Sequence, residues 1–155
     1  MKRKWLLPFL VLALLSVGAL FIETQPASEE SLRAINGSDT AWLLIATALV
    51  LLMTPGLSFF YGGMVSFRNV VSTMLQSFIA LGVVSVLWVV VGFSLAFGDS
   101  IGGVIGNPAT FFMWRNVHTG THPTLSPTIP LMLFALFQLK FAIITPALIT
   151  GSFAE

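Results

Sequence analysis

The stretch "LLMTPGLSFFYGGMVSF", Leu51 to Phe67, combines the apolar density of a membrane helix with residues that interrupt helices. Proline removes a backbone hydrogen bond, and glycine is a weak helix former. In lipid a freed carbonyl has no water to bond, so the interruption at Pro55-Gly56 is tolerated only against protein or a water-filled cavity. We therefore expect a kinked helix that packs closely on other helices through its small residues. Those small residues are Gly56, Ser58, Gly62 and Gly63.

The composition of the chain is that of a membrane protein. Apolar residues make up 56% of it, and its seven basic and six acidic residues gather in short stretches between long apolar runs. This distribution is typical of a polytopic membrane protein rather than a soluble domain. The net charge of +1 indicates neither nucleic acid nor an acidic partner. Because the chain has no cysteine, disulfides and thiolate metal sites are excluded.

Four apolar runs approach or exceed the roughly 20 residues that a membrane-spanning helix needs. The first extends from Trp5 to Ile22, and the other three predict helices at about 41–62, 70–97 and 129–154. Lys140 is the one charged residue within these last three runs. We expect an all-α membrane protein whose helices form a bundle.

The first run differs from the others because the basic triplet Lys2 to Lys4 precedes it and a polar segment follows it. Basic residues before a leucine-rich core are typical of a secretory signal peptide. We interpret 1–25 as a cleaved signal, with Val17-Gly18-Ala19 as a candidate cleavage region, or alternatively as a retained N-terminal anchor. In both interpretations 26–40 is an extracytoplasmic tail.

The basic residues also predict the direction of each helix. Arg68 is the only charge in the short loop after the second run, so we expect that loop in the cytoplasm. By alternation the loop 98–128 lies outside. This loop is rich in Gly, Pro, Ser and Thr, which predicts irregular structure.

Four segments resemble the ammonium transporter (Amt/Rh) family, in that family's order and spacing. "DTAWLLIATALVLLMTPGLSFFYGGMV" (39–65) is similar to its first membrane helix. "RNVVSTMLQSF" (68–78) and "LWVVVGFSLAFGD" (87–99) are similar to the two ends of its second helix. "FQLKFAIITPALITGSFAE" (137–155) is similar to its third. The resemblance implies that 41–155 is the N-terminal part of an ammonium transporter domain.

This resemblance implies a fold, a function and partners. The family has about eleven membrane helices in two inverted repeats, of which this chain would supply three, and it assembles as a homotrimer. The implied substrate is ammonium or ammonia. A cytoplasmic regulatory protein of the nitrogen-signalling type is an implied partner, beside membrane lipid. We expect a multi-pass protein of the inner (plasma) membrane with its mature N-terminus outside, no enzymatic activity and no cofactor.

Aromatic spacing in the last run suggests a cation-binding face. Aromatic rings replace part of the water around a cation. Phe137 and Phe141 are four residues apart and share one helix face, which Ile144 and Leu148 continue. Aromatic residues at helical spacing are also common packing residues in membrane helices, so the spacing alone leaves both interpretations open.

The resemblance assigns roles to five residues. Phe137 is similar to an outer-vestibule aromatic, Phe141 to a gate phenylalanine and Leu148 to an apolar pore-lining residue. Phe60 and Tyr61 are similar to residues near the inner end of the pore. The family's paired pore histidines, its buried aspartate and its second gate phenylalanine lie on later helices than those matched here.

Two motifs of the outer loop have a plain interpretation beside a functional one. His118 and His122 in "HTGTH" would bind a metal only if the loop aligned both, and Gly120 disfavours helical spacing. They should not be taken for the family's pore histidines. The glycine-rich "IGGVIGN" (101–107) lacks the lysine of a phosphate loop. We expect a turn-rich loop and no metal site.

Lys140 departs from the family pattern, in which this position is apolar or small. A lysine near the centre of a membrane helix costs about 2.5–3.5 kcal/mol on insertion scales. Its side chain either extends toward the outer surface or faces the vestibule, where its charge would repel ammonium.

Two functions of different classes remain. The first is ammonium transport as part of a longer channel-like transporter, with this chain inactive alone. No basic residue follows the last run, which favours a fragment of a longer protein. The alternative is a truncated membrane scaffold, or an ammonium-sensing regulatory subunit without transport. The membrane runs contain no nucleophile–base pair that would suggest an enzyme.

The positions of the basic residues generate a topology prediction. A reporter fused after Arg68 should lie in the cytoplasm, and one fused near Pro108 should lie outside, because basic loops are retained on the cytoplasmic side. A pair of enzymatic reporters, each active on one side of the membrane, measures this directly. Reversed activities would contradict the orientation.

Overall fold

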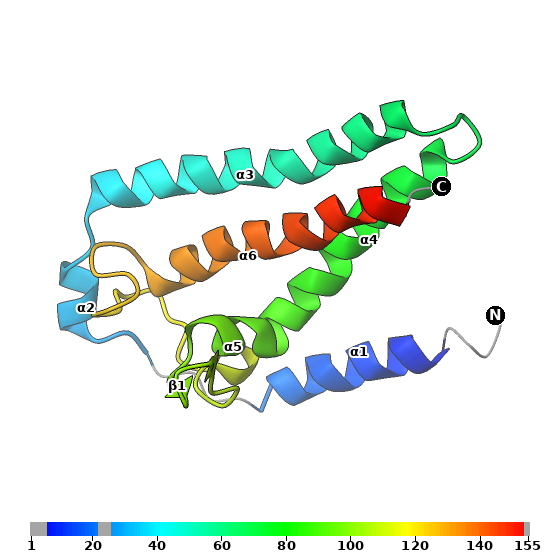
Figure 1. Cartoon of the computed structure of the whole chain (residues 1–155). Helices are drawn as coiled ribbons and strands as arrows, with labels where there is room; N and C mark the ends of the chain where they lie inside the picture. The colour runs from blue at the N-terminus through cyan, green and yellow to red at the C-terminus, as the bar shows by residue number, and fades with distance from the viewer. Residues whose placement is uncertain (1–5, 22–25, 154–155) are drawn as a thin grey trace.

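The computed structural model describes residues 6–21 and 26–153. Its long helices are α3 (Gly37–Met64), α4 (Val70–Leu87) and α6 (Leu131–Ile149), and each of them contacts the other two (Figure 1). The shorter elements are α1 (Leu6–Ala19), α2 (Glu29–Arg33), the π-helix η2 (Trp88–Gly92), α5 (Phe93–Phe97), β1 (Ser100–Ile101), β2 (Ile105–Gly106), the 3₁₀ helix η3 (Phe112–Trp114) and the 3₁₀ helix η4 (Thr150–Phe153).

Three helical segments of the described chain are long and apolar enough to cross a membrane: Gly37–Met64, Val70–Phe97 and Leu131–Ser152. The expected all-α, polytopic bundle is therefore confirmed. α3 begins earlier than 41 because the Asn36 side chain caps it, accepting a hydrogen bond from the Ser38 amide at 2.9 Å. α1 has 14 residues, fewer than the roughly 20 that span a bilayer. Whether 1–25 is a signal or an anchor stays a prediction, and Trp5 and Ile22 lie outside the described residues.

The helices alternate in direction. α3 and α6 run the same way and α4 runs opposite to them (Figure 1). α2, the beginnings of α3 and α6, and most of the loop 98–130 gather at one end of the molecule. This arrangement matches the predicted alternation, while the side of the membrane that each end faces stays a prediction.

A row of small residues brings α3 against α4. Thr54, Ser58 and Gly62 are four residues apart, so they share one face, and all three are buried. The Ser58 hydroxyl donates to the Met74 carbonyl of α4 at 3.1 Å. A Cβ on Gly62 would lie only 3.0 Å from the Met74 Cγ, so glycine is what allows this approach. The helix continues through Pro55, and the row beside it supplies the predicted packing.

The other two predicted small residues make no close contact within the described part of this chain. An added Cβ on Gly56 or Gly63 would meet no atom within 4 Å beyond its own helix neighbours. Both residues are exposed because they lie on the opposite side of α3 from Ser58 and Gly62. Close packing therefore uses one face of the helix only.

The end of the bundle at which α6 begins holds an aromatic core. Its five buried residues come from α5, the loop and α6, and are Phe93, Phe111, Val117, Leu131 and Ala135. Ser94 ties the loop to α5, because its hydroxyl oxygen accepts a hydrogen bond from the Phe111 amide at 2.7 Å. The core positions the beginning of α6.

The second spanning segment changes its winding at η2. In this π-helix each backbone hydrogen bond joins residues five positions apart, one more than in an α-helix, which widens the turn. The Trp88 indole N–H donates to the Ala135 carbonyl of α6 at 3.1 Å. The Trp88 ring meets Phe93 edge-on, with ring centroids 5.9 Å apart. The widened turn therefore lies where this segment is fixed to α6.

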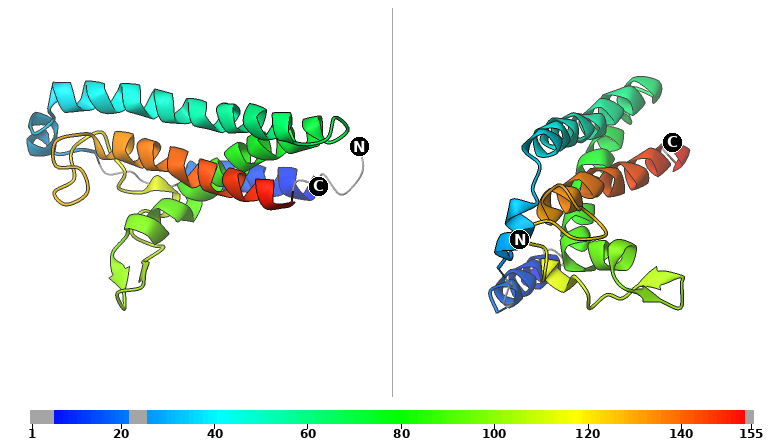
Figure 2. Two further views of the ribbon diagram at one scale, coloured as in Figure 1. Left: turned by 45° about the horizontal axis from the view of Figure 1, so that its top comes forward. Right: turned by 90° about the vertical axis from the view of Figure 1, so that its left-hand side faces the viewer.

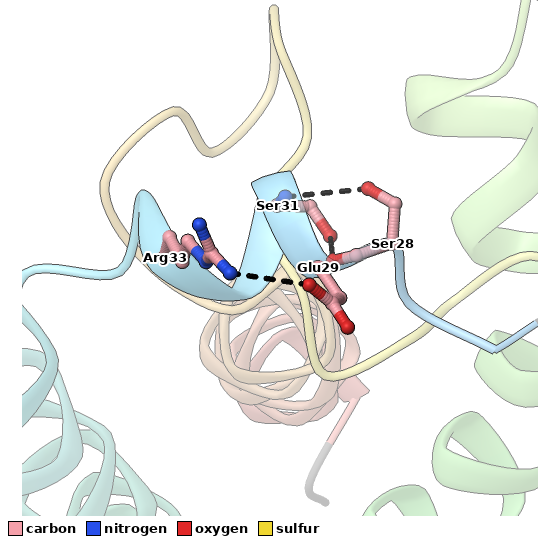
Figure 3. A network of polar contacts seen from close by, with 4 residues as sticks. All are labelled: Ser28, Glu29, Ser31 and Arg33. Atoms are coloured by element: carbon pink, nitrogen blue, oxygen red, sulfur yellow. Dashed lines mark hydrogen bonds and ion pairs between the residues drawn. The ribbon is translucent and has the colours of Figure 1, made fainter.

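The polar tail contains a helix that was not predicted. Ser28 caps α2, since its hydroxyl oxygen accepts from the Ser31 amide at 3.2 Å, and Arg33 pairs with Glu29 at 3.2 Å (Figure 3). The loop 98–128, predicted to be irregular, contains the β1–β2 hairpin as well as η3. Gly102 and Gly103 adopt positive φ angles at the hairpin turn, so "IGGVIGN" is a turn as expected.

The Gly62 contact generates a stability prediction. Replacing Gly62 by leucine should lower stability by about 1–3 kcal/mol, the usual cost of overpacking a well-packed contact. The matched control is Gly63→Leu, which gains the same helix propensity in open space. Thermal unfolding in detergent measures both. Equal melting temperatures for the two variants would contradict the close α3–α4 approach.

Candidate functional site

Phe137 and Phe141 form an aromatic pair on α6. Their ring centroids lie 5.1 Å apart and the ring planes meet at 74°, an edge-on contact. Phe141 is 40% exposed, so its ring is open to a ligand or to another helix. The two rings share one helix face, as their four-residue spacing predicts.

Two further residues continue this face by their spacing. Leu148 is 49% exposed, whereas Ile144 is buried. Around the helix axis, Phe141 and Ile144 lie at opposite edges of the stripe that they form with Phe137 and Leu148. The edge at Ile144 is shared with the buried Leu133 and Ala147, which face the other helices.

Tyr61 joins the C-terminal ends of α3 and α6. Its hydroxyl donates to the Leu148 carbonyl at 2.9 Å, which satisfies one of the last carbonyls of α6. Gly151 leaves room for this ring, since a Cβ there would lie 2.7 Å from the Tyr61 Cζ. The structure thus brings together Tyr61 and Leu148, which are 87 positions apart in sequence.

The five candidate residues form two groups. Phe60 contacts the neighbouring Tyr61 ring at 5.7 Å but is itself 61% exposed. Among the described residues, no ring contact joins Phe60 to Phe141. Seven residues separate Phe141 from Leu148, about 10 Å along the helix. The aromatic pair and the group around Tyr61 therefore lie at two levels of one bundle.

Lys140 lies deep in α6. It stands nine residues after Leu131, about 14 Å along the helix, close to half of the roughly 30 Å hydrocarbon thickness. Its side chain is half-buried, about 100° around the helix from Phe141. Within the described chain it has no carboxylate partner, the ion pair present there being Arg33 with Glu29. Both interpretations of Lys140 stay predictions.

The two loop histidines hold backbone turns. The His118 Nδ1 accepts a hydrogen bond from the Gly120 amide at 3.1 Å. The His122 Nδ1 accepts from the Leu125 amide at 3.3 Å and lies 3.2 Å from the Thr124 hydroxyl. In both rings Nδ1 thus serves as the acceptor for a nearby backbone amide. The described residues contain no group of three metal-ligating side chains.

The same loop caps α6. Pro130 precedes the helix and provides no side-chain cap. The Leu131 amide instead donates to the Gly120 carbonyl at 2.9 Å, and the Met132 amide donates to the His118 carbonyl at 3.1 Å. These contacts satisfy amides that a helix N-terminus leaves free. "HTGTH" thus supports the helix that carries the aromatic pair.

The tail helix α2 closes on this loop. Gly120 lies so close to α2 that a Cβ there would collide with the Ser31 side chain. The Thr121 amide and hydroxyl both donate to the Ser31 carbonyl, at 3.2 and 3.1 Å. The contact between α2 and this loop could not be predicted from the sequence, because backbone atoms make most of it. The helix itself had a signal in "SEESL", a capping serine followed by two acidic residues.

The pKa of His122 lies below its ordinary value of 6.5. Burial is the main cause, the neighbouring His118 lowers the pKa further, and the carboxylate of Asp99 acts in the opposite direction. These two histidines and Asp99 line a cavity of about 370 Å³ formed by the loop 98–128. The ring therefore favours the neutral form that accepts the Leu125 hydrogen bond.

Comparison with known proteins places this geometry in context. Residues 41–155 match the family described as "Ammonium Transporter Family". An ammonium transporter of Mycobacterium tuberculosis is 44% identical over 133 residues, which cover 77% of this chain and 28% of that protein. A putative ammonium transporter of Methanothermobacter thermautotrophicus is 47% identical over 122 residues, covering 78% of this chain and 30% of that protein.

A solved structure is also similar. The crystal structure of the Mep2 mutant delta442 from Candida albicans superposes with a TM-score of 0.62 at 30% sequence identity. The match covers 74% of this chain and 28% of that one. The chain thus spans less than a third of the length of the proteins it matches.

The His122 geometry generates a pH prediction. Because the folded-state pKa of His122 is lowered, its stabilisation of the turn 122–126 is fully present above pH 6.5 and is lost as pH falls through the lowered value. Acidification should reduce amide protection at Leu125 by about fivefold, the factor for one hydrogen bond of about 1 kcal/mol. Hydrogen exchange, corrected for the intrinsic pH dependence of the exchange rate, measures this.

Two asparagine variants serve as controls for that measurement. In His122→Asn the amide oxygen replaces Nδ1 as acceptor and does not titrate, so protection should no longer depend on pH. In His118→Asn the dependence should persist. Persistence of the full effect in His122→Asn would assign it to another group.

Proposed function

This chain belongs to the ammonium transporter family, and we propose on that basis that its three spanning helices form one part of an ammonium-conducting pore. The relatives are named as transporters, not enzymes. Since the chain spans less than a third of their length, conduction is proposed for a protein of the relatives' full length. The aromatic pair of the half-buried Phe137 and the exposed Phe141 is the observation that carries the proposal.

The chemistry of ammonium explains why an aromatic pair matters. Moving a small cation out of water is costly unless other groups replace its hydration shell. The face of an aromatic ring attracts a cation by about 2 kcal/mol or more when water is excluded. Phe141, open on one side and held in place by Phe137, offers such a face.

The remaining candidates take positions along the same pathway. We propose Phe137 at the outer vestibule, Phe141 at the gate and Leu148 on the apolar wall below it. Phe60 and Tyr61 lie near the inner exit, where Tyr61 also fixes α3 to α6. Lys140 stands about a quarter turn from Phe141, so we propose that it does not face the cation directly.

We further propose that the 155-residue chain does not conduct alone. Apolar side chains on α3 and α4 are widely exposed, and Gly56 and Gly82 meet no neighbouring atom. The spanning helices contain no histidine and no carboxylate beyond the first turn of α3, so they offer no proton relay at mid-membrane. The cost of desolvating ammonium would stay unopposed.

The proposed setting is the inner (plasma) membrane, with the mature N-terminus outside and three copies per assembly. The wide apolar faces of α3 and α4 are available to further helices and to neighbouring copies. A cytoplasmic regulatory protein of the nitrogen-signalling type is the proposed soluble partner. The alternative, a membrane scaffold or ammonium sensor without transport, is distinguished by the uptake experiment that follows.

Methylammonium uptake into liposomes tests the proposal. We expect no saturable uptake by the 155-residue chain. A chimaera that joins it to the later helices of a full-length relative should show uptake. In that chimaera Phe141→Ala should lower uptake up to about 30-fold, the factor that corresponds to about 2 kcal/mol of lost cation–π attraction.

A matched aromatic control accompanies this test. Phe59 is also an exposed phenylalanine, on α3, and has no proposed role in conduction. Phe59→Ala should leave uptake near that of the unmodified chimaera. Saturable uptake by the 155-residue chain alone would contradict its proposed inactivity. A chimaera that shows no uptake would favour the alternative function of a membrane scaffold or sensor.

A further inference from the structure

The β1–β2 hairpin stands apart from the rest of the outer loop. Ser100 pairs with Gly106 and Ile101 with Ile105 across two antiparallel strands. In both views of Figure 2 the hairpin projects away from the helices. In Figure 1 it lies to the side of α5, whereas α2 lies beyond the ends of the long helices. The hairpin thus extends sideways near the level at which the spanning helices end.

The end of this hairpin is apolar and exposed. Val104 at the turn is 90% exposed, and Ile101 and Ile105 on either side are about half exposed. Between Asp99 and Arg115 the sequence contains no charged residue. Three clustered aliphatic side chains are unfavourable in water, so we expect this tip to contact an apolar partner.

The backbone of the hairpin suits an environment poor in water. The two strands pair in antiparallel register, the Val104 amide donates to the Ile101 carbonyl at 3.3 Å, and the Asn107 amide donates to the Asp99 carbonyl at 2.7 Å. A segment that enters the boundary of a bilayer must satisfy its backbone internally. The hairpin meets much of this requirement.

The residues that follow have the composition of a membrane–water boundary. Phe112 is 46% exposed and Arg115 is exposed, with the half-buried Trp114 between them. Aromatic and basic residues gather at the headgroup level of membrane proteins. The hairpin tip and this segment come from one loop, whose two exposed parts are both apolar or aromatic.

We propose that the hairpin tip, Ile101, Val104 and Ile105, inserts into the headgroup–acyl boundary of the bilayer and anchors the outer loop to lipid. The occupant is phospholipid rather than a second copy of the chain. A stable interface between copies buries about 800 Å² per partner, far more than three aliphatic side chains supply. The proposal does not depend on ammonium conduction.

The consequence concerns the loop that caps α6. The hairpin follows α5 directly, and Asp99 at its base is tied to Thr110, whose hydroxyl donates to the carboxylate at 3.2 Å. A tip held in lipid restrains the segment that leads to the α6 cap. Lipid contact would thereby steady the outer end of the helix that carries Phe141.

Site-directed spin labelling tests the insertion. Because the chain has no cysteine, Val104→Cys gives a single labelling site. The protein is reconstituted in phosphatidylcholine–phosphatidylglycerol vesicles, and accessibility to molecular oxygen and to a water-soluble nickel chelate is measured by power saturation. Two control sites give the reference accessibilities for lipid and for water. The lipid reference is Leu49→Cys on the exposed face of α3, and the water reference is Glu30→Cys on α2.

The expected result is an oxygen-to-nickel ratio at Val104 several-fold above that at Glu30 and shifted toward that at Leu49. A ratio equal to that at Glu30 would place the tip in water and overturn the proposal. Low accessibility to both reagents, together with short label-to-label distances between copies, would identify a protein contact and overturn it as well. None of these outcomes depends on uptake, so failure here is separable from failure of the transport proposal.

Discussion

The close approach of α3 to α4 is the constraint on which the rest of the bundle depends. Only a row of small residues lets two helix backbones come near enough for the Ser58 hydroxyl to reach the Met74 carbonyl. Without bulk water to drive association, packing and such polar contacts must hold the helices together. α6 then lies against both helices, fixed by Trp88 near one end and by Tyr61 at the other.

Helix ends in this molecule are completed by distant segments. The first amides of α6 bond the carbonyls of "HTGTH", and one of its last carbonyls bonds Tyr61 of α3. Each contact satisfies a backbone group that would otherwise be left free near the membrane boundary. The aromatic pair on α6 is therefore oriented by contacts at both ends of its helix, made outside α6 itself.

Much of the fold followed from the sequence, because long apolar runs and few charges leave little choice of architecture. The shared face of Phe137 and Phe141 followed from helical spacing. Spacing did not reveal that Gly56 and Gly63 face away from α4, since the phase of the packed face depends on the neighbouring helices. The cap of α6 could not be predicted either, because its acceptors are backbone carbonyls that any residue possesses. The role of Tyr61 at the end of α6 required knowledge of which helices lie side by side.

The π-helix from Trp88 to Gly92 has a consequence for how this segment tolerates insertion and deletion. A π turn holds one residue more than the α-helical turn it replaces, which is equivalent to a single inserted residue. Removing one residue there would restore the ordinary α-helical winding and leave the residues beyond it facing as they do now, because the wide turn already absorbs the extra residue. Phe93 and Ser94 would stay buried. The same deletion within α4 would instead rotate everything beyond it by about 100° and exchange the buried and the exposed side of the segment.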